Sequence, residues 1–402
     1  MRIRTRGLTL LAGAVFVVSA CSGGATQAPA SEAPPASEAP ASEAPASEAP
    51  ASEAPTGSDL KIGVQTDVGT VNDKNFNEYT YVGAKEGAAA IGAAEPPVFV
   101  PKDASEYPVG LQNYVDQGFD IIVVSGFNAI GETTKFAKAN PETWFVGVDH
   151  SPCVDAEGNP DPTFTCAGNA NLATLLPNYV GLNYQEDQAG YLAGIVAAGA
   201  SKSGTIGAIG GITLCGPCVR YIQGYVLGAK SVNPDIVVKV AWVSDSDFTK
   251  AFADQAGGKT FAQQFIQQNS GIDVVFQVAG LTGNGIIDAA CEAGILAVGV
   301  DVDQYQAYPA GQPCIVTSAT KSLSLSVSES IKAIAAGSAQ GGIQIWDAAK
   351  DGVGYAPFYE HESKVAADTK QKADEAFEQM KAGALETCPA DCGAVPAPPI
   401  GD

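Results

Sequence analysis

Several side chains that could bind a small molecule stand at the ends of short apolar runs. Asp67, Asp149 and Asp301 end or follow three of these runs, and Lys321 follows a fourth. An aspartate accepts two hydroxyl hydrogen bonds at once, and aromatic faces stack on flat or apolar rings. Glycines such as Gly280 let backbone N–H groups come close to a ligand. This inventory predicts a neutral, polyhydroxylated ligand that contains a ring.

Each candidate also has an ordinary structural interpretation. Asp67, Asp149 and Asp301 could be helix N-caps, which is the usual role of an aspartate after a strand. Phe76 could belong to the core through an apolar helical face, and Phe248 could pack beneath its own helix. The shared position after apolar runs favours a common site over separate structural roles.

The apolar runs alternate with helix-length segments from residue 60 onward. Several runs consist almost wholly of Val, Ile, Ala and Gly, which is typical of parallel strands buried on both faces. The alternation predicts an α/β fold with doubly wound sheets, and ten strands are too many for one core, so we expect two lobes. Ligands bind beyond the carboxyl ends of such strands. The predicted strands lie in residues 61–66, 97–101, 120–126, 143–149, 179–184, 204–211, 236–243, 273–280, 295–301 and 314–320.

The beginning of the chain has the features of an export signal. Three arginines precede a short apolar run that ends in Val18-Ser19-Ala20-Cys21. This resembles a bacterial lipobox, whose cysteine is lipidated after cleavage; an ordinary secretory signal with a chance cysteine is the alternative. We expect residues 1–20 to be a lipoprotein signal peptide, Cys21 to carry the lipid, and the protein to be extracytoplasmic and anchored to the cell membrane.

Residues 21–58 are of low complexity. Ala-Ser-Glu-Ala-Pro recurs in them and offers no apolar face to bury, while frequent proline favours an extended chain. We interpret the segment as a disordered tether; a Pro-rich ligand for another domain is the alternative.

Charge excludes some ligand classes. The formal charge is −22, and the lysines are scattered, so the basic footprint of a nucleic-acid binder is missing. Receptors for amino acids or phosphates usually clamp the anion with arginine. After the signal the chain has a single arginine, Arg220, and a neutral ligand therefore fits the inventory better.

The cysteines predict disulfides. Eight follow Cys21, and an even number in an exported chain favours pairing. Cys215-Gly-Pro-Cys218 also has the spacing of a redox centre, which is a competing interpretation. A zinc site is weaker, because neither His150 nor His361 stands at ligand spacing from a cysteine pair. Close spacing favours the pairs Cys153 with Cys166, Cys215 with Cys218, Cys291 with Cys314, and Cys388 with Cys392.

Catalytic signatures are weak. The chain has no G-x-S-x-G, H-E-x-x-H or Walker A pattern, and two histidines leave little for acid–base chemistry. A hydrolase built on the carboxylates of Asp67 and Asp149 is the remaining enzyme interpretation. We expect no enzymatic activity, no cofactor and no metal.

Residues 66–88, TDVGTVNDKNFNEYTYVGAKEGA, resemble the opening motif of the basic membrane protein family. Its members are ABC-transporter substrate-binding lipoproteins similar to purine nucleoside receptors. The resemblance runs from about Leu60 to Ile345 in the family's order and continues into GVGYAPF. The further matching segments are YVDQGFDIIVVSGF, ETWFVGVD, DQAGYLAGIVAA, VNPDI, DVVFQVAGLTGNG, AVGVDVDQ and VTSATKS.

The resemblance implies a type I periplasmic-binding fold, with two α/β lobes joined by a three-strand hinge. It implies a small-molecule ligand, expected to be a purine nucleoside, and partnership with an ABC permease and ATPase; we expect a monomer. The predicted N-terminal lobe is 59–180 plus 304–340, the C-terminal lobe is 181–303 plus 341–386, and 387–402 form a tail.

The same resemblance assigns the binding site. Phe76 and Phe248 would sandwich the purine, while Asp67 and Asp149 would bind polar edges of the base. Asn77 would be a polar neighbour. The residues that fall where the family holds the ribose are Gly280, Asp301 and Lys321.

The chain departs from the family pattern in places. Thr70 stands where a second glycine is common, and the loop 151–178 is longer than usual. We expect this loop to border the cleft. Two alternatives for the function therefore stay open: a binding protein for a sugar or another ring-bearing neutral metabolite, or a ligand-sensing receptor domain.

Overall fold

The computed structural model of the protein describes residues 58–401. The predicted signal peptide, the lipidation site Cys21 and all of the tether except Ser58 lie outside the described residues. Within residues 58–401, every helix is too short or too polar to cross a lipid bilayer.

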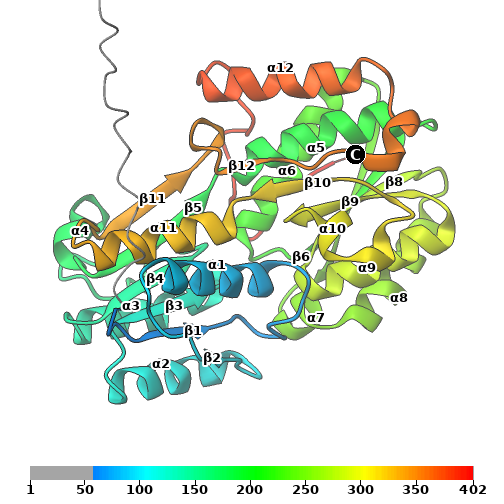
Figure 1. Ribbon diagram of the computed structural model, residues 1–402. Coiled ribbons are helices and arrows are strands. Elements are labelled where there is room, and N and C mark those ends of the chain that lie inside the picture. Colours follow the sequence, from blue (N-terminus) through cyan, green and yellow to red (C-terminus); the bar gives the residue numbers. More distant parts are fainter. Residues whose placement is uncertain (1–57, 402) are drawn as a thin grey trace, which may run out of the picture. The chain divides into compact units, whose positions relative to one another are not determined.

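The first sheet has six strands in the order β11-β5-β4-β3-β1-β2, and neighbouring strands run parallel (Figure 1). Its central strands are buried on both faces, which explains their unbroken apolar sequences. The edge strand β11 instead alternates half-buried and exposed residues. The strands are β1 (Ile62–Gln65), β2 (Val98–Phe99), β3 (Ile121–Ser125), β4 (Trp144–Val148), β5 (Tyr179–Tyr184) and β11 (Gly342–Trp346).

The second sheet repeats this plan in the order β12-β10-β9-β8-β6-β7. Only the short edge strand β12 runs antiparallel to its neighbour among these strands. Each strand of the first sheet thus has a counterpart in the second, with β4 matching β9 and β5 matching β10. The strands are β6 (Thr205–Ile212), β7 (Val237–Ser244), β8 (Val274–Val278), β9 (Leu296–Asp301), β10 (Ile315–Lys321) and β12 (Val353–Tyr355).

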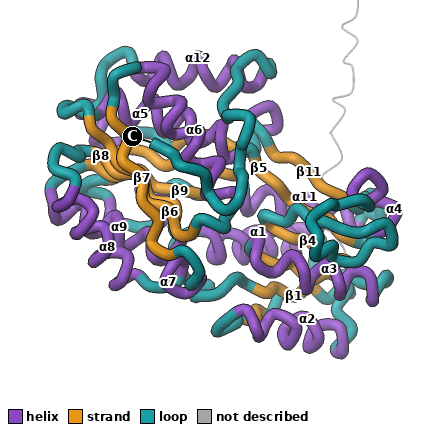
Figure 2. Tube along the Cα trace, turned by 180° about the vertical axis from the view of Figure 1, so that it is seen from behind, coloured by secondary structure: helices purple, strands orange, loops and turns teal. Residues whose placement is uncertain are grey.

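Helices cover both faces of each sheet (Figures 1 and 2). In the first lobe they are α1 (Phe76–Ala90) and α11 (Leu323–Ala335) on one face, α2 (Tyr107–Asp116) and α3 (Ile130–Ala139) on the other, and the short α4 (Leu172–Leu175). In the second lobe they are α5 (Glu186–Ala200) and α6 (Gly216–Val232), α8 (Gln255–Gln268) and α9 (Gly280–Ala293), α7 (Phe248–Phe252), α10 (Gln304–Ala307) and α12 (Thr369–Lys381). Short 3₁₀ turns are η1 (Ala104–Glu106), η2 (Phe127–Ala129), η3 (Asn169–Asn171), η4 (Pro309–Gly311), η5 (Ala348–Lys350) and η6 (Tyr359–Lys364).

Glycine lets the helix pair α5 and α6 pack closely. A Cβ atom on Gly194 would lie 2.1 Å from the carbonyl oxygen of Tyr225, and one on Gly228 would lie 1.9 Å from that of Tyr191. A larger residue at either position would push the helices apart.

The described chain passes between the sheets three times. It leaves β5 of the first sheet for α5, returns from β10 to α11, and crosses once more from β11 to β12. The predicted α/β fold with two doubly wound lobes and a three-strand hinge is therefore confirmed. Each of the ten predicted strand segments contains a strand.

The predicted lobe boundaries are wrong at the hinge. Residues 304–340 were assigned to the first lobe, but β10 pairs with β9 in the second sheet. Residues 181–184 and β11 were assigned to the second lobe, but β5 and β11 pair with each other in the first sheet. Strand pairing between distant segments decides lobe membership, and sequence position alone does not reveal it.

The described residues contain the four disulfides that close spacing favours. Cys153–Cys166 closes the 151–178 loop, and Cys291–Cys314 joins the end of α9 to the start of β10. Cys388–Cys392 lies in the tail, and Cys215–Cys218 lies at the start of α6.

Candidate functional site

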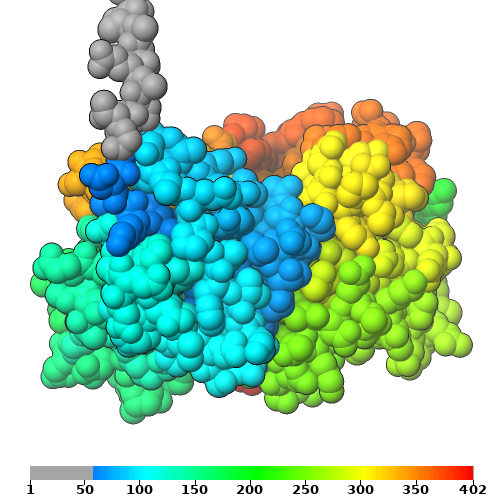
Figure 3. All heavy atoms as spheres, turned by 60° about the horizontal axis from the view of Figure 1, so that its bottom comes forward, coloured from blue at the N-terminus to red at the C-terminus, as the bar shows by residue number. Residues whose placement is uncertain are grey.

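A cavity of about 60 Å³ lies between the two lobes, at the carboxyl ends of their strands. That is room for only a handful of water molecules, so the lobes must move apart before a ligand of nucleoside size can enter. In Figure 3 the blue and cyan atoms of the first lobe meet the green and yellow atoms of the second. Of the eight predicted ligand residues, the cavity is lined by Asp67, Phe76, Asn77, Asp149, Gly280, Asp301 and Lys321.

The loop between β1 and α1 forms one wall of the cavity. Asp67 is buried, and its carboxylate accepts hydrogen bonds from the hydroxyl of Tyr107 and from the backbone N–H of Val68. The side-chain oxygen of Asn77 accepts the backbone N–H of Asp67 at 3.0 Å. Asp67 therefore does not cap a helix, which the ordinary interpretation of this residue required.

The helix cap in this loop is Asp73. Its carboxylate accepts the backbone N–H groups of Asn75, Asn77 and Glu78, at 2.9 to 3.0 Å. These bonds satisfy the free donors at the start of α1. Because α1 begins at Phe76, the cap fixes where this ring enters the cavity wall.

The absence of a side chain at Gly126 leaves room for the carboxylate of Asp67. The residue follows β3 with a φ of +92°, a left-handed conformation that favours glycine. A Cβ atom here would lie 2.2 Å from Oδ2 of Asp67. Replacement by a larger residue would displace this carboxylate from the cavity wall.

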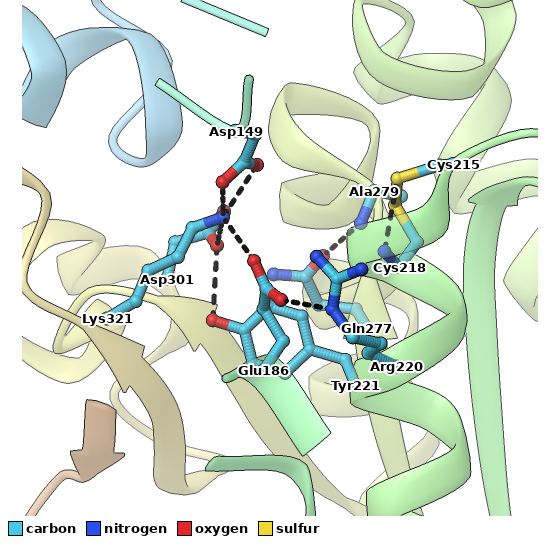
Figure 4. The surroundings of a disulfide bond; sticks show 10 residues. All are labelled: Asp149, Glu186, Cys215, Cys218, Arg220, Tyr221, Gln277, Ala279, Asp301 and Lys321. Atoms are coloured by element: carbon cyan, nitrogen blue, oxygen red, sulfur yellow. Dashed lines mark hydrogen bonds and ion pairs between the residues drawn. A yellow bond between two sulfur atoms is a disulfide. The ribbon is translucent and has the colours of Figure 1, made fainter. Parts of the chain in front are cut away.

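Lys321 is the centre of a buried ion cluster (Figure 4). Its Nζ lies 2.8 Å from Asp149 Oδ2, 3.4 Å from Asp301 Oδ1 and 3.6 Å from Glu186 Oε1. The Nε of Arg220 binds the other oxygen of Glu186 at 2.7 Å. Three carboxylates thus face two cations, so the cluster is acidic and suits a neutral or cationic ligand better than an anion.

The cluster joins the lobes at their hinge. Asp149 follows β4 of the first sheet, Lys321 ends β10 of the second, and Glu186 begins α5 directly after the first crossing. Asp149 and Asp301 occupy matching positions in the two sheets, and both have left-handed backbones, with φ of 62° and 64°. Aspartate tolerates this conformation better than most residues, and it places both carboxylates on the same lysine.

Burial shifts the pKa values of these groups. Burial raises the pKa of Asp149 and of Asp301, and the Lys321 ammonium opposes both rises. Burial alone would lower the pKa of Lys321, but the carboxylates of Asp149, Asp301 and Glu186 outweigh it and raise that pKa. The lysine is therefore a fixed cation.

The aromatic walls differ in part from the sequence prediction. Phe76 lines the cavity, and the Nζ of Lys321 lies 4.9 Å from its ring centroid. Phe248 does not line the cavity; it packs on Phe127 at a centroid distance of 5.9 Å. Phe252, one turn later on α7, and Phe127 take the lining positions instead. Of the two rings on α7, Phe252 lines the cavity, and the predicted Phe248 does not.

Phe127, Glu186 and Tyr221 also contribute to the cavity wall or to the ion cluster, although they were not among the predicted site residues. Phe127 could have been found, because it directly follows the strand 120–126. Glu186 and Tyr221 carried no signal, since each reaches the cluster from a helix. Tyr221 donates its hydroxyl to Asp301 Oδ1 at 3.3 Å.

We expected the loop 151–178 to border the cavity, but it does not. None of its residues lines the cavity. His150, which precedes it, is buried and hydrogen-bonds through its ring nitrogens with the Tyr179 hydroxyl and the carbonyl of Gly126. Burial lowers the pKa of His150 to about 3, so the ring stays neutral. Its hydrogen bonds lie in the interior of the first lobe.

Asp67 should make stability depend on pH. Burial raises its pKa to about 6, against the lowering effect of the Tyr107 hydroxyl. Between about pH 4 and pH 6 the folded state then holds a proton that the unfolded state has released, so the free energy of unfolding falls as the pH rises through this window. Urea unfolding at several pH values should show this fall, and Asp67→Asn should reduce it.

A matched control for this measurement is Asp235→Asn, at an exposed position. Its pH dependence should equal that of the unchanged protein. If Asp67→Asn also leaves the slope unchanged, Asp67 does not hold the raised pKa.

Comparison with known proteins places this site in a family context. A family model described as "ABC transporter substrate-binding protein PnrA-like" matches residues 60–384. The ABC transporter nucleoside-binding protein BmpA of Lactococcus lactis subsp. cremoris is 31% identical over 259 residues. That alignment covers 61% of this chain and 65% of the relative, so this chain spans slightly less than two thirds of its length.

Two further similarities concern a lipoprotein and a solved structure. An uncharacterized lipoprotein of Pyrococcus horikoshii is 27% identical over 311 residues, which are 74% of this chain and 69% of the relative. The crystal structure of an ABC transporter system solute-binding protein from Aeropyrum pernix K1 superposes with a TM-score of 0.68 at 22% identity. It covers 83% of this chain and 94% of that chain, and this likeness shows the fold.

Proposed function

The chain belongs to the family of PnrA-like ABC transporter substrate-binding proteins and has the type I periplasmic-binding fold, and from this premise we propose that it binds a purine nucleoside between its lobes. It would deliver this ligand to an ABC permease with its ATPase. The nucleoside-binding description of the Lactococcus lactis relative supports this choice of ligand.

The observation that carries the proposal is the composition of the interlobe cavity. Aromatic rings from both lobes, Phe76 and Phe252, line the same cavity as the carboxylates of Asp67 and Asp301. Rings of this kind stack on a base, and carboxylates accept hydrogen bonds from sugar hydroxyls. Arg220 is the single arginine after the signal, and it forms an ion pair with Glu186. It is therefore not free to bind an anionic ligand.

We assign the roles as the family resemblance implies, with one change. Phe76 and Phe252 hold the base between them, and Asp67 with Asn77 binds its polar edge together with Asp149. The residues proposed to hold the ribose are Gly280, Asp301 and Lys321.

Closure of the lobes is the proposed mechanism. The side-chain amide of Asn284 on α9 donates to the carbonyl of Asp73 at 2.9 Å, and Lys321 reaches across to Asp149. Both contacts join the first lobe to the second. A ligand that touches both lobes adds to these contacts and shifts the population toward the closed form, which the permease would recognise.

The proposal includes a lipid anchor at Cys21. The lipobox-like Val18-Ser19-Ala20-Cys21 supports it, as does the lipoprotein name of the Pyrococcus horikoshii relative. Labelling of cells with an alkyne-tagged fatty acid tests the anchor: the protein should take up the label, and Cys21→Ala should abolish the uptake.

A thermal-shift panel of nucleosides, free bases, sugars and amino acids tests the ligand. A ligand present at a hundredfold excess over its Kd stabilises the fold by about 2.7 kcal/mol. Purine nucleosides should raise the melting temperature most. A shift by pentoses or hexoses without one by any nucleoside would favour the sugar-binding alternative and refute the proposal.

The helix α7 offers a matched pair of variants. Phe252→Ala should weaken nucleoside binding by roughly tenfold, because a stacked base loses its partner. Phe248→Ala should leave the Kd nearly unchanged, because this ring lies behind Phe127 and outside the cavity lining. Isothermal titration calorimetry measures both, and the reverse order of effects would restore Phe248 as the base-stacking residue.

A further inference from the structure

The disulfide Cys215–Cys218 lies in the wall of the ligand cavity, a position that the proposed function does not use. Cys215, Pro217 and Cys218 all line the cavity, on the side of the second lobe. Figure 4 shows the disulfide at the start of α6. No other disulfide of the described residues contributes to this lining.

The start of α6 stabilises a thiolate at Cys215. Cys215 is the N-cap of this 17-residue helix, and its Sγ accepts the backbone N–H of Cys218 at 3.1 Å. Helix N-termini carry a partial positive charge, and thiols placed there ionise more readily. If the disulfide opens, Cys215 is therefore the better leaving group and Cys218 Sγ is the sulfur that a thiol attacks.

Cys215 and Cys218 border the cavity between the lobes and are nearly buried. The two cysteines are only 3% and 6% exposed, whereas Cys153, Cys166, Cys388 and Cys392 are half-buried or exposed. The cavity wall that faces them comes from the first lobe and includes Asp67 and Phe76. The route to Cys218 through this cavity opens when the lobes part.

The C-terminal tail holds this wall independently of the disulfide. The backbone N–H of Ala397 donates to the carbonyl of Thr213 at 2.7 Å, and that of Gly393 donates to Gln223 Oε1 at 2.9 Å. Figure 2 shows the C-terminus beside β7, and a Cβ atom on Gly401 would lie 2.4 Å from the carbonyl oxygen of Val238 in that strand. Since both ends of the 213–223 segment are tied, opening the disulfide does not release the wall from the lobe.

We propose that Cys215–Cys218 is a redox-active modification site inside the ligand cleft, open to low-molecular-weight thiols when the lobes part and shielded when they close. A thiolate attacks Cys218 Sγ, a mixed disulfide forms, and Cys215 leaves as a thiolate. A second thiol attacks the mixed disulfide on its small-molecule sulfur. The products are the protein dithiol and the oxidised small disulfide, so two electrons pass from the two thiols to the protein.

Reduction then weakens ligand binding. It frees the two sulfurs to separate, so the part of the wall that the ligand contacts loses its fixed geometry. Two claims rest on the proposed nucleoside function: that reduction weakens ligand binding, and that bound ligand shields the disulfide. The claim that lobe closure limits the reduction of the disulfide does not depend on the ligand.

Each disulfide can be followed separately in the full chain. Trypsin cleavage after lysine and arginine leaves the four disulfides in peptides 139–202, 203–220, 260–321 and 382–402. The protein is exposed to dithiothreitol under native conditions, trapped with N-ethylmaleimide over time and digested. Mass spectrometry of the four peptides gives four reduction rates.

The first comparison needs no ligand. Asn284→Ala removes the interlobe hydrogen bond to Asp73, so the reduction of 203–220 should accelerate while that of 139–202 and 382–402 stays the same. Asn113→Ala, at an exposed position of α2, is the matched control and should change no rate. If the peptide 203–220 is reduced at the same rate in Asn284→Ala and in the unchanged protein, lobe closure does not control the reduction of this disulfide.

The second comparison uses inosine at a hundredfold excess over its Kd. About 1% of the protein is then ligand-free, so reduction of 203–220 should slow by about a hundredfold. The Cys215→Ser/Cys218→Ser variant should bind inosine at least about fivefold more weakly. If inosine raises the melting temperature but does not slow this reduction, the bound ligand does not shield the disulfide. If the variant has an unchanged Kd, loss of the disulfide does not weaken ligand binding.

If no purine nucleoside raises the melting temperature, the proposed ligand is wrong. The Asn284→Ala comparison then still decides whether lobe closure controls the disulfide. The two failures are therefore distinguishable.

Discussion

Replacing Lys321 with glutamine should lower the free energy of unfolding by about 3–5 kcal/mol, the range for removing one partner of a buried ion pair. Its ammonium is buried and lies within 2.8 to 3.6 Å of Asp149, Asp301 and Glu186. Without it, three buried carboxylates would share Arg220 as their nearest cation, and desolvated charges without a partner are costly. Urea unfolding measured at neutral pH gives this difference.

The control is Lys332→Gln on α11. Lys332 pairs with Glu329 on the surface, with both side chains 40% or more exposed. Such a pair contributes about 0–1 kcal/mol. The double variant Lys321→Gln/Asp149→Asn should recover part of the lost stability, because it removes a charge together with its partner. A loss for Lys321→Gln no larger than that for Lys332→Gln would show that the cluster is solvated.

The second large effect concerns ligand binding. Phe76→Ala should weaken nucleoside binding by about 1–3 kcal/mol, the usual contribution of one aromatic ring stacked on a base. The ring lies at the start of α1, where the Asp73 cap positions it in the cavity wall beside Lys321. Isothermal titration calorimetry should show this as an increase of Kd of about five- to 160-fold.

Tyr81→Ala is the matched control, because Tyr81 is an aromatic residue of the same helix outside the cavity lining. Its hydroxyl donates to Glu95 and to the carbonyl of Pro96 instead. The Kd of this variant should stay close to that of the unchanged protein. A Phe76→Ala variant that melts lower but binds equally well would return this ring to a purely structural role.

Much of the cavity could be predicted from sequence, because parallel strands impose a local rule. A buried parallel strand appears as an unbroken apolar run, and the residue that follows it lies at the edge where ligands bind. Asp67, Asp149, Asp301 and Lys321 were found in this way, and all four line the cavity. The same rule applies to Phe127, which directly follows the predicted strand 120–126 and also lines the cavity.

Residues that reach the site from helices escaped this rule. Glu186 and Tyr221 lie at and near helix starts, and the Cys215–Cys218 disulfide caps α6. On α7, which has only five residues, Phe248 and Phe252 are one turn apart. Packing of the whole helix against Phe127 decides which ring enters the cavity, and no local pattern encodes that contact.

The sequence by itself determined the α/β character, ten of the twelve strands in the described chain, the disulfide spacing and the residues at the strand ends. These features depend on burial and chain direction over a few residues. The tertiary structure decided which sheet β10 and β11 join, and that Lys321 gathers carboxylates from three distant segments. The β11–β5 pairing and the contacts of Lys321 with Asp149 and Glu186 join residues more than a hundred positions apart, and their free energy is set by the assembled lobes.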